Sequence, residues 1–358
     1  MNKFYDTTRY KLIDWIDESK LDFKSLSQNR RAVFYLKDHL DKVDWYHFSL
    51  NPSAIDILEK NINKLKKSIN ENINAIELLR KNRYLINVSL LSSNDNGFEL
   101  LREYKDNINW RCLTYKENAI DLIIENVDSL DDDYWISRNP ACLKFYNKFP
   151  NKFNINWQLF PINPNGIELI KENLDKFDCW SWYYLCQNKN PESINIIEDN
   201  LDKLDDECWV SLCENQNAIH LIKDNLDRLT EKAWCKLCRN PKAIDIIKDQ
   251  FDYISKNTLI TQMILLNPNK DIIKLIQDNL NYFQNYILFN EMISKHKHSI
   301  DFLKKRRDLI DYKSFSSNEQ IFTIDYQFYK ERCSIYQEEL MKNRFDPKNI
   351  NKFEDWGF

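Results

Sequence analysis

The chain has 358 residues, of which 43% are apolar, and its 10 Trp, 18 Tyr and 20 Phe supply ample material for a packed interior. A net charge of −4 with 30% charged residues argues against nucleic-acid binding, for which a basic surface is typical. The count of 3 Gly leaves little room for glycine-rich phosphate loops, and no apolar run is long enough to predict a membrane span.

The N-terminal stretch MNKFYDTTRYKLIDW has no apolar segment of the kind found in signal peptides. Nine Cys, an odd count without a signal peptide, indicate reduced thiols rather than a disulfide framework. We therefore expect an intracellular protein.

The dominant feature is a tandem repeat, clearest in residues 190–215 and 215–240, which align without a gap. Both stretches contain an apolar pair, then Asn-Leu-Asp-Lys/Arg-Leu, then Trp-x-x-Leu-Cys. A repeat of 21 to 29 residues is typical of solenoids built from short two-element units. The residues taken as anchors of successive units are Asn29, Asn51, Asn72, Asn94, Lys116, Asn139, Asn163, Asn190, Asn215, Asn240, Asn267, His296 and Asn318.

Each unit is expected to begin with a helix of about three turns. Asn-Pro occurs at several anchors, for example at residues 51–52 and 240–241. Asn is a strong N-cap, and Pro fits the first helical position because its missing N–H would be unpaired there. Ala54, Ile55 and Leu58 follow at helical spacing, as do their counterparts in other units.

A second Asn follows ten residues after many anchors. We interpret it as the end of the first helix, in the left-handed conformation that Asn tolerates. The alternative is a ladder in which this Asn bonds the backbone of the next unit. The positions are Asn61, Asn82, Asn126, Asn173, Asn200 and Asn225.

A second N-cap residue, fifteen residues after the anchor, predicts a second and shorter helix. This helix carries Trp and, three residues later, Leu or Phe, which we expect in the core because short helices are stable only when they pack. The N-cap positions are Asp44, Asp131, Asp178, Asp205, Thr230 and Ser255. The pairs are Trp45/Phe48, Trp110/Leu113, Trp157/Phe160, Trp209/Leu212 and Trp234/Leu237.

These patterns predict an all-α fold, an α-solenoid (superhelix) of about 13 short helix-turn-helix repeats with degenerate N- and C-terminal caps. Residues 1–28 form the N-terminal capping repeat, 29–318 the solenoid repeats and 319–358 the C-terminal cap, with Phe345, Phe353 and Trp356 as its aromatic contacts. At roughly 9 Å per unit, the array would extend on the order of 100 Å and present a long groove.

Units of the form NPxAIxLIxxNLDKLDxxxWxxLCxNP resemble the Asn-Pro tandem repeats abundant in giant DNA viruses of the mimivirus type. Residues 341–358 are similar to the usual close of that family, with Asp346-Pro347 and Asn349 where His-Pro and Arg are common. The resemblance covers roughly residues 20–358 and brings no catalytic residues. It implies an α-solenoid, a viral source and protein–protein contact.

The cysteines offer a candidate metal site, because Cys235 and Cys238 form a Cys-x-x-Cys pair with Cys208, Cys213 and His220 nearby in sequence. However, equivalent positions in stacked helices lie roughly 8–10 Å apart. That is too far to share an ion held at about 2.3 Å from each sulfur. Packing in the core is the favoured interpretation, with zinc binding and redox chemistry as alternatives.

Charged clusters and Trp residues are the other candidates for chemistry. The acidic residues 131–133 and 205–207 recur where second helices begin, which favours capping over acid–base catalysis. The basic stretch 295–307 fits a solvated helix face better than an import signal or phosphate site. The Trp series fits the core better than a stacking platform. The candidate partner-binding residues are Trp180 and Trp182, which depart from the regular Trp spacing, with Lys304, Arg306 and Arg307.

We therefore predict a non-catalytic scaffold that binds a host or viral protein or peptide in the solenoid groove, with no cofactor and no metal. A structural component of the virus particle is the first alternative, and an enzyme with an unrecognised groove site is the second. The expected location is the cytoplasm of the infected host cell, or the virion if the first alternative holds. The oligomeric state stays open.

Overall fold

The computed structural model describes residues 8–104, 106–130, 134–150 and 153–344. Within these ranges the regular structure is helical apart from two short strands, β1 (Tyr10–Leu12) and β2 (Phe322–Ile324), which confirms the prediction of an all-α fold. No helix of the described part is long and apolar enough to cross a membrane. The predicted cap Asp131 and the aromatic residues Phe345, Phe353 and Trp356 lie outside the described residues.

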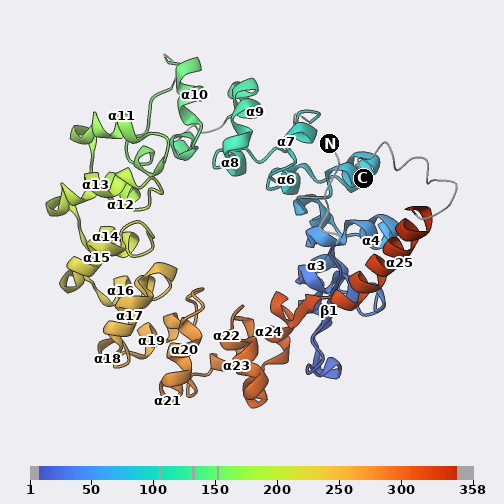
Figure 1. Cartoon of the computed structure of the whole chain (residues 1–358). Helices are drawn as coiled ribbons and strands as arrows, with labels where there is room; N and C mark the ends of the chain where they lie inside the picture. The colour runs from blue at the N-terminus through green and yellow to red at the C-terminus, as the bar shows by residue number, and fades with distance from the viewer. Residues whose placement is uncertain (1–7, 105, 131–133, 151–152, 345–358) are drawn as a thin grey trace.

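The helices form two concentric layers around a ring (Figure 1). The second helix of each unit lies on the side of the ring centre, and we call these the inner helices. Most neighbouring inner helices contact one another directly. They are α1 (Phe23–Gln28), α3 (Trp45–Leu50), η5 (Lys67–Glu71), α6 (Val88–Leu91), α8 (Trp110–Leu113), η9 (Tyr134–Arg138), η10 (Phe160–Ile162), α12 (Cys179–Cys186), α14 (Asp206–Leu212), α16 (Glu231–Leu237), α19 (Thr258–Ile264), α22 (Phe289–Lys295) and α24 (Tyr312–Ser316).

The first helix of each unit lies on the outer side and belongs to what we call the outer helices (Figure 1). They are α2 (Val33–Lys37), α4 (Ile55–Lys60), α5 (Ile76–Lys81), α7 (Phe98–Leu101), α9 (Ile120–Glu125), α10 (Cys142–Lys148), α11 (Ile167–Lys171), α13 (Glu192–Glu198), α15 (Ile219–Asp224), α17 (Ile244–Asp249), α20 (Ile272–Asp278) and α23 (Ile300–Lys305). Short helices α18 (Phe251–Ile254) and α21 (Leu280–Phe283) follow two of them, and α25 (Tyr326–Arg344) ends the described chain.

Most of the predicted caps are present. Asn51 accepts the N–H of Ser53, and Pro52 takes the first helical position behind it. Asp205 caps α14 by accepting the N–H of Cys208 at 2.9 Å, so this acidic residue is a cap as predicted. Ser255 is the exception, because the N-cap of α19 is Asn257, whose side chain accepts two backbone N–H groups.

The predicted core positions are buried. Ala54 and Leu58 of the first helix are fully buried, and so is Phe48 of the second. The Trp that precedes this position is buried in the longer units, as in Trp209 and Trp234, each 3% exposed. In the shorter units it is only half-buried.

The Asn that ends the first helix does not use the left-handed conformation. Asn61 has φ −126°, and its Nδ2 donates to the carbonyl of Ile57, four residues earlier, at 2.9 Å. Asn82, Asn126 and Asn225 bond the fourth preceding carbonyl in the same way. The predicted left-handed stop is therefore wrong, because the side-chain amide satisfies a terminal carbonyl without any backbone strain. The alternative of an inter-unit ladder at these residues is wrong as well.

The ladder is formed by the anchor residues instead. Nδ2 of Asn94 donates to the carbonyls of Asn70 and Asn72 in the preceding unit, both at 2.8 Å. Its Oδ1 accepts the N–H of Asn96 at 3.0 Å. One buried amide thus caps its own helix and bonds two backbone groups of its neighbour. We call this the Asn ladder, with Asn at positions 29, 51, 72, 94, 139, 163, 188, 215, 240, 267 and 318. Position 116 holds Lys, whose Nζ donates to the Ser93 carbonyl at 2.9 Å, and position 296 holds His.

One predicted anchor is displaced by two residues. Asn188, not Asn190, occupies the ladder, where its Nδ2 donates to the carbonyls of Pro161 and Asn163 at 2.7 and 3.0 Å. Asn190 caps the following helix by accepting the N–H of Glu192 at 3.0 Å. The same separation recurs at Asn267, which holds the ladder while Asn269 accepts the N–H of Asp271 at 2.9 Å.

His296 reproduces the ladder amide with an imidazole. Its Nε2 lies 2.8 Å from the carbonyl of Asn267, and its Nδ1 accepts the N–H of His298 at 3.2 Å. This pattern requires the neutral ring with its proton on Nε2. Burial lowers the pKa of His296, and the nearby His298 and Lys297 add to that effect against the raising effect of the Asn267 carbonyl.

We expect His296→Asn to make the fold less sensitive to acid. The unfolded chain takes up a proton at its ordinary pKa of 6.5, whereas the folded chain resists protonation of His296. Stability from this group is therefore complete above that pKa and falls as the pH drops below it. Urea midpoints of wild type and variant should diverge between about pH 7.5 and pH 5.5. The same dependence of the urea midpoint on pH in both proteins would contradict the proposed effect of His296 protonation.

The variable repeat length comes mainly from the inner helices. In α12, α14 and α16 the N-cap lies ten residues before the ladder residue rather than seven, and these helices have 8, 7 and 7 residues. Three added residues make nearly one turn, so the core face stays in register. Leu185, Leu212 and Leu237 accordingly remain fully buried three residues before the ladder.

The two ends of the array meet and close the ring. Nδ2 of Asn29 donates to the carbonyls of Ser316 and Asn318, both at 3.1 Å. The N–H of Asp22 donates to Oγ of Ser316 at 2.8 Å. We call this junction the seam. Helices α1 and α24 pack together there as other neighbouring inner helices do (Figure 1).

The seam repeats the geometry of an internal junction. Between the first two units, Asn51 donates to the carbonyls of Ser27 and Asn29 at 3.2 and 3.1 Å. The N–H of Asp44 donates to Oγ of Ser27 at 3.0 Å. Equivalent donors bond equivalent acceptors at the seam. The first unit therefore packs on the last unit as each unit packs on the one before it.

A small sheet reinforces the seam. β1 and β2 pair antiparallel, with Tyr10 opposite Ile324. Arg9 forms an ion pair with Asp325 at 3.1 Å. The prediction of an extended array is therefore wrong, because the two ends of the chain's repeat array bond to each other. The division into 1–28, 29–318 and 319–358 stays a prediction.

Candidate interaction surface

The inner helices carry one face that the repeat leaves variable. The positions one, five and eight residues before each ladder residue lie on one side of the inner helix. The buried position, three residues before the ladder residue, lies on the opposite side, and the position four residues before it lies next to the first set. Core, cap and ladder residues recur from unit to unit. A site specific to one part of the ring is therefore expected among these variable positions.

Aromatic and arginine side chains gather at these positions in one part of the ring. They are concentrated around α8, η9 and α12, whereas Tyr46 and Arg239 are isolated examples in other units. We call this set the aromatic–arginine cluster. Its members are Arg111, Tyr115, Trp135, Arg138, Trp180, Tyr183 and Tyr184.

Arg138 is the centre of the cluster. Its guanidinium lies 5.4 Å from the ring of Tyr115, 6.0 Å from Trp135 and 5.3 Å from Tyr184. These rings come from three different units, those of α8, η9 and α12. The Arg111 guanidinium lies 5.2 Å from the Trp135 ring. Each such contact contributes about 0.5–1 kcal/mol at exposed sites.

The cluster ends in an exposed indole. Trp180 is 55% exposed and contacts Tyr183 at 5.8 Å between ring centres, and Tyr183 contacts Tyr184 at 5.2 Å. Tyr115 is 41% exposed at the opposite end. An exposed run of aromatic rings of this kind is unusual on a surface where nothing binds.

A cavity of about 540 Å³ adjoins the cluster beside α8. Trp110, Arg111 and Trp135 line it together with Asn107 and Ser89. Asn107 has φ +64°, the left-handed conformation, in the turn that leads into α8. The cavity extends the aromatic surface toward the preceding unit.

The predicted site residues divide between surface and core. Trp180 lies in the aromatic–arginine cluster, as a partner-binding role requires. Trp182 is 7% exposed and packs edge-on against Phe177 with ring centres 5.2 Å apart. Its proposed role in direct binding is therefore corrected, because its indole belongs to the core.

The predicted basic residues lie elsewhere. Lys304 is exposed on α23, on a different side of the ring from α12 (Figure 1). Arg306 forms two hydrogen bonds with the Asp308 carboxylate at 3.0 and 2.8 Å. Arg307 lies 5.3 Å from the ring of Trp15. The two arginines thus have partners within the chain, and the structure does not bring these residues together with Trp180.

The cysteines pack mainly as core residues. Cys213 and Cys238 are fully buried, as the packing interpretation predicts, whereas Cys235 is half-buried. Burial raises the pKa of Cys213 to about 12, which suppresses its thiolate near neutral pH. Within the described residues no group of three or more His, Cys, Asp or Glu is placed to hold a metal ion.

Thiol alkylation should follow this burial. We expect Cys179 and Cys333, which are exposed, to react with iodoacetamide well before the buried cysteines. Mass spectrometry of digested samples, with a denatured sample as control, gives the order. Alkylation of native Cys213 as fast as Cys179 would contradict the core assignment. The cysteines expected to resist are Cys142, Cys186, Cys208, Cys213 and Cys238.

Sequence reasoning missed Arg138, Tyr115 and Trp135. A signal was available, because all three stand at positions whose side chain varies from unit to unit. Comparison of the chain with protein-family models, with curated proteins and with solved structures finds no match.

Proposed function

We propose that the chain is a closed α-solenoid scaffold without catalysis, which binds a protein or peptide partner at the aromatic–arginine cluster. The observation that supports this is the unrepeated nature of the cluster. Stability explains residues that recur at fixed positions, but it does not explain exposed Trp180 and Tyr115 at variable ones.

The chemistry of the cluster suits a protein partner. Trp, Tyr and Arg dominate the binding energy of protein interfaces. Arg138 is already held between three rings, so it loses little side-chain entropy when a partner contacts it. The wide inner face offers room for a segment that crosses several units.

A peptide-display selection tests this proposal. Peptides selected on the wild-type protein should lose at least tenfold in affinity for the double variant Arg138→Ala/Trp180→Ala. Tyr46→Ala is the matched control, because Tyr46 is 53% exposed on the inner helix α3, away from the cluster. Peptides that bind wild type and double variant equally would rule out the cluster as the binding site.

The virion alternative has its own test. We also propose that the chain is an Asn-Pro repeat protein of the giant-virus type, since the Asn ladder gives the anchor Asn of that signature a physical role. Abundance in purified particles at a fixed ratio to capsid protein would favour a structural component. Absence of the protein from purified particles, with one bound partner recovered from infected cells, would favour the scaffold.

A further inference from the structure

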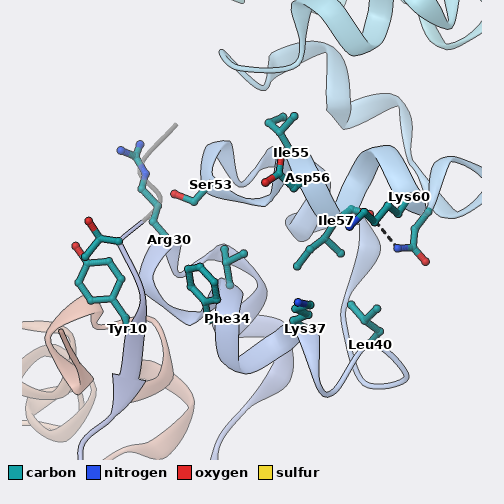
Figure 2. A pocket seen from close by; sticks show the side chains of 13 residues that line it. Tyr10, Arg30, Phe34, Lys37, Leu40, Ser53, Ile55, Asp56, Ile57 and Lys60 are labelled. Atoms are coloured by element: carbon teal, nitrogen blue, oxygen red, sulfur yellow. Dashed lines mark hydrogen bonds between the residues drawn. The ribbon is translucent and has the colours of Figure 1, made fainter. Parts of the chain in front are cut away.

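A second cavity lies beside the seam, among outer helices, and we call it the seam pocket (Figure 2). Its volume is about 260 Å³. Residues of β1, α2 and α4 form its walls. They include Tyr10, Arg30, Phe34, Lys37, Ile55 and Lys60.

The inside of the seam pocket is largely apolar. Val33 and Ile55 come from neighbouring units and are 8% and 7% exposed. The phenyl ring of Phe34 stands between Tyr10 and Lys37, and it is 36% exposed (Figure 2). A large aromatic side chain is therefore left open to a small ligand at this place.

The rim of the seam pocket is cationic. Arg30, Lys37 and Lys60 line it together with a single carboxylate, that of Asp56. In the described part of the chain these three cations form no ion pair. The pocket thus has a local excess of positive charge in a protein whose net charge is −4. Such a rim favours an anionic group over a neutral or cationic one.

The pocket wall is part of the seam. Tyr10 belongs to β1 and pairs with Ile324 of β2. The Arg31 guanidinium lies 5.0 Å from the Tyr10 ring, and its Nη1 donates to the carbonyl of Phe322 at 3.4 Å. A ligand that contacts Tyr10 therefore contacts the strand that holds the two ends of the ring together.

We propose that the seam pocket binds a small amphipathic anion, a carboxylate on an apolar chain, and that this binding stabilises the closed ring. The apolar chain covers Phe34 and Val33, and the carboxylate meets Lys37 and Lys60. A volume of about 260 Å³ lies below the usual range of roughly 300–1,000 Å³ for drug-sized ligands. The site suits a single short chain and excludes a dinucleotide or a folded partner.

Binding is tested with three probes that share one chain, decanoate, decanol and decyltrimethylammonium. Isothermal calorimetry on the full chain should give the tightest binding for decanoate, at least tenfold weaker binding for decanol, and none for the cation. Equal affinity for all three probes would mean that the cationic rim does not contribute to binding, and it would contradict the proposal. Failure of decanoate to bind would overturn the proposal.

Charge-reversal variants locate the site. Lys37→Glu and Lys60→Glu change side chains at the rim and should each weaken decanoate binding at least tenfold. Lys223→Glu on α15 is the control for the same charge change on an exposed outer helix and should bind as wild type. Loss of binding in the control as well would place the ligand elsewhere.

Hydrogen exchange tests the link to the seam. The N–H of Ile13 donates to the carbonyl of Ile321 at 3.0 Å, and that of Asp325 to Arg9 at 2.9 Å. With decanoate at ten times its dissociation constant, exchange of these two amides should slow about tenfold. The Asn225 amide, bonded to Ile222 far from the seam, is the control. Binding without slower exchange at the seam would disprove the coupling, and neither result depends on the aromatic–arginine cluster.

Discussion

Replacing Asn94 by Ala is expected to lower the free energy of unfolding by about 3–5 kcal/mol. The change removes three hydrogen bonds, two to carbonyls of the preceding unit and one from the Asn96 N–H. Asn94 is fully buried, so water does not readily replace its amide, although the Asn72 carbonyl keeps the Ala75 N–H at 3.0 Å. Urea denaturation followed by circular dichroism measures the loss.

The matched control is Asn96→Ala. The Asn96 amide also reaches the preceding unit, but through a single exposed bond to the Ile73 carbonyl at 2.7 Å. Its loss should lower the free energy of unfolding by no more than about 1 kcal/mol, because water replaces the partner. Similar losses in both variants would mean that burial of the ladder amide has no special weight.

Replacing Asn29 by Asp is expected to open the ring while the units stay folded. The new carboxylate still accepts the Arg31 N–H, which Asn29 bonds at 3.0 Å, so the helix cap survives. The other carboxylate oxygen faces the carbonyls of Ser316 and Asn318, where an amide donated before. Two donors are lost and oxygen meets oxygen, which is costly in a buried site.

Small-angle X-ray scattering measures this opening. The radius of gyration should rise by several ångströms, while the helical circular dichroism signal stays close to that of wild type. Asn225→Asp is the control for the charge, since Asn225 ends the outer helix α15 far from the seam and bonds the Leu221 carbonyl as Asn61 bonds its own helix. A variant with the wild-type radius of gyration would mean that the Asn29 bonds do not hold the seam.

Much of the unit could be predicted from the sequence because its signals are local. Caps such as Asp205, apolar spacing such as Ala54 to Leu58, and the paired Trp and Leu all act within one or two helical turns. The role of Asn was harder to assign. An Asn side chain can cap a helix, end a helix or bond the preceding unit. Asn61 and Asn94 differ in which backbone carbonyls their Nδ2 atoms bond.

Ring closure could not be predicted from any single unit. Thirteen units close a full turn only if each rotates by roughly 28° relative to the last. That rotation depends on the way in which inner helices of different lengths pack against one another. Small changes, accumulated over the array, decide between an open superhelix and a ring.

The site was partly predicted for a related reason. Once Asn188 is the ladder residue, Trp182 stands six residues before it, at the regular core position of the Trp series. The displaced anchor at Asn190 made this Trp look irregular. Arg138 escaped notice because its three aromatic partners lie in three different units, and no local spacing connects them.

Ring closure is tested most directly by a distance measured between spin labels. Lys24 and Lys313 each stand five residues before a ladder residue, in the units that meet at the seam. Lys24 and Tyr46 hold the same positions at the first internal junction. Nitroxides are placed at each pair after the exposed Cys179 and Cys333 are changed to Ser. A closed ring predicts the same short distance for both pairs by double electron–electron resonance. A short distance for Lys24 and Tyr46 with a long one for Lys24 and Lys313 would show an open array and contradict the ring.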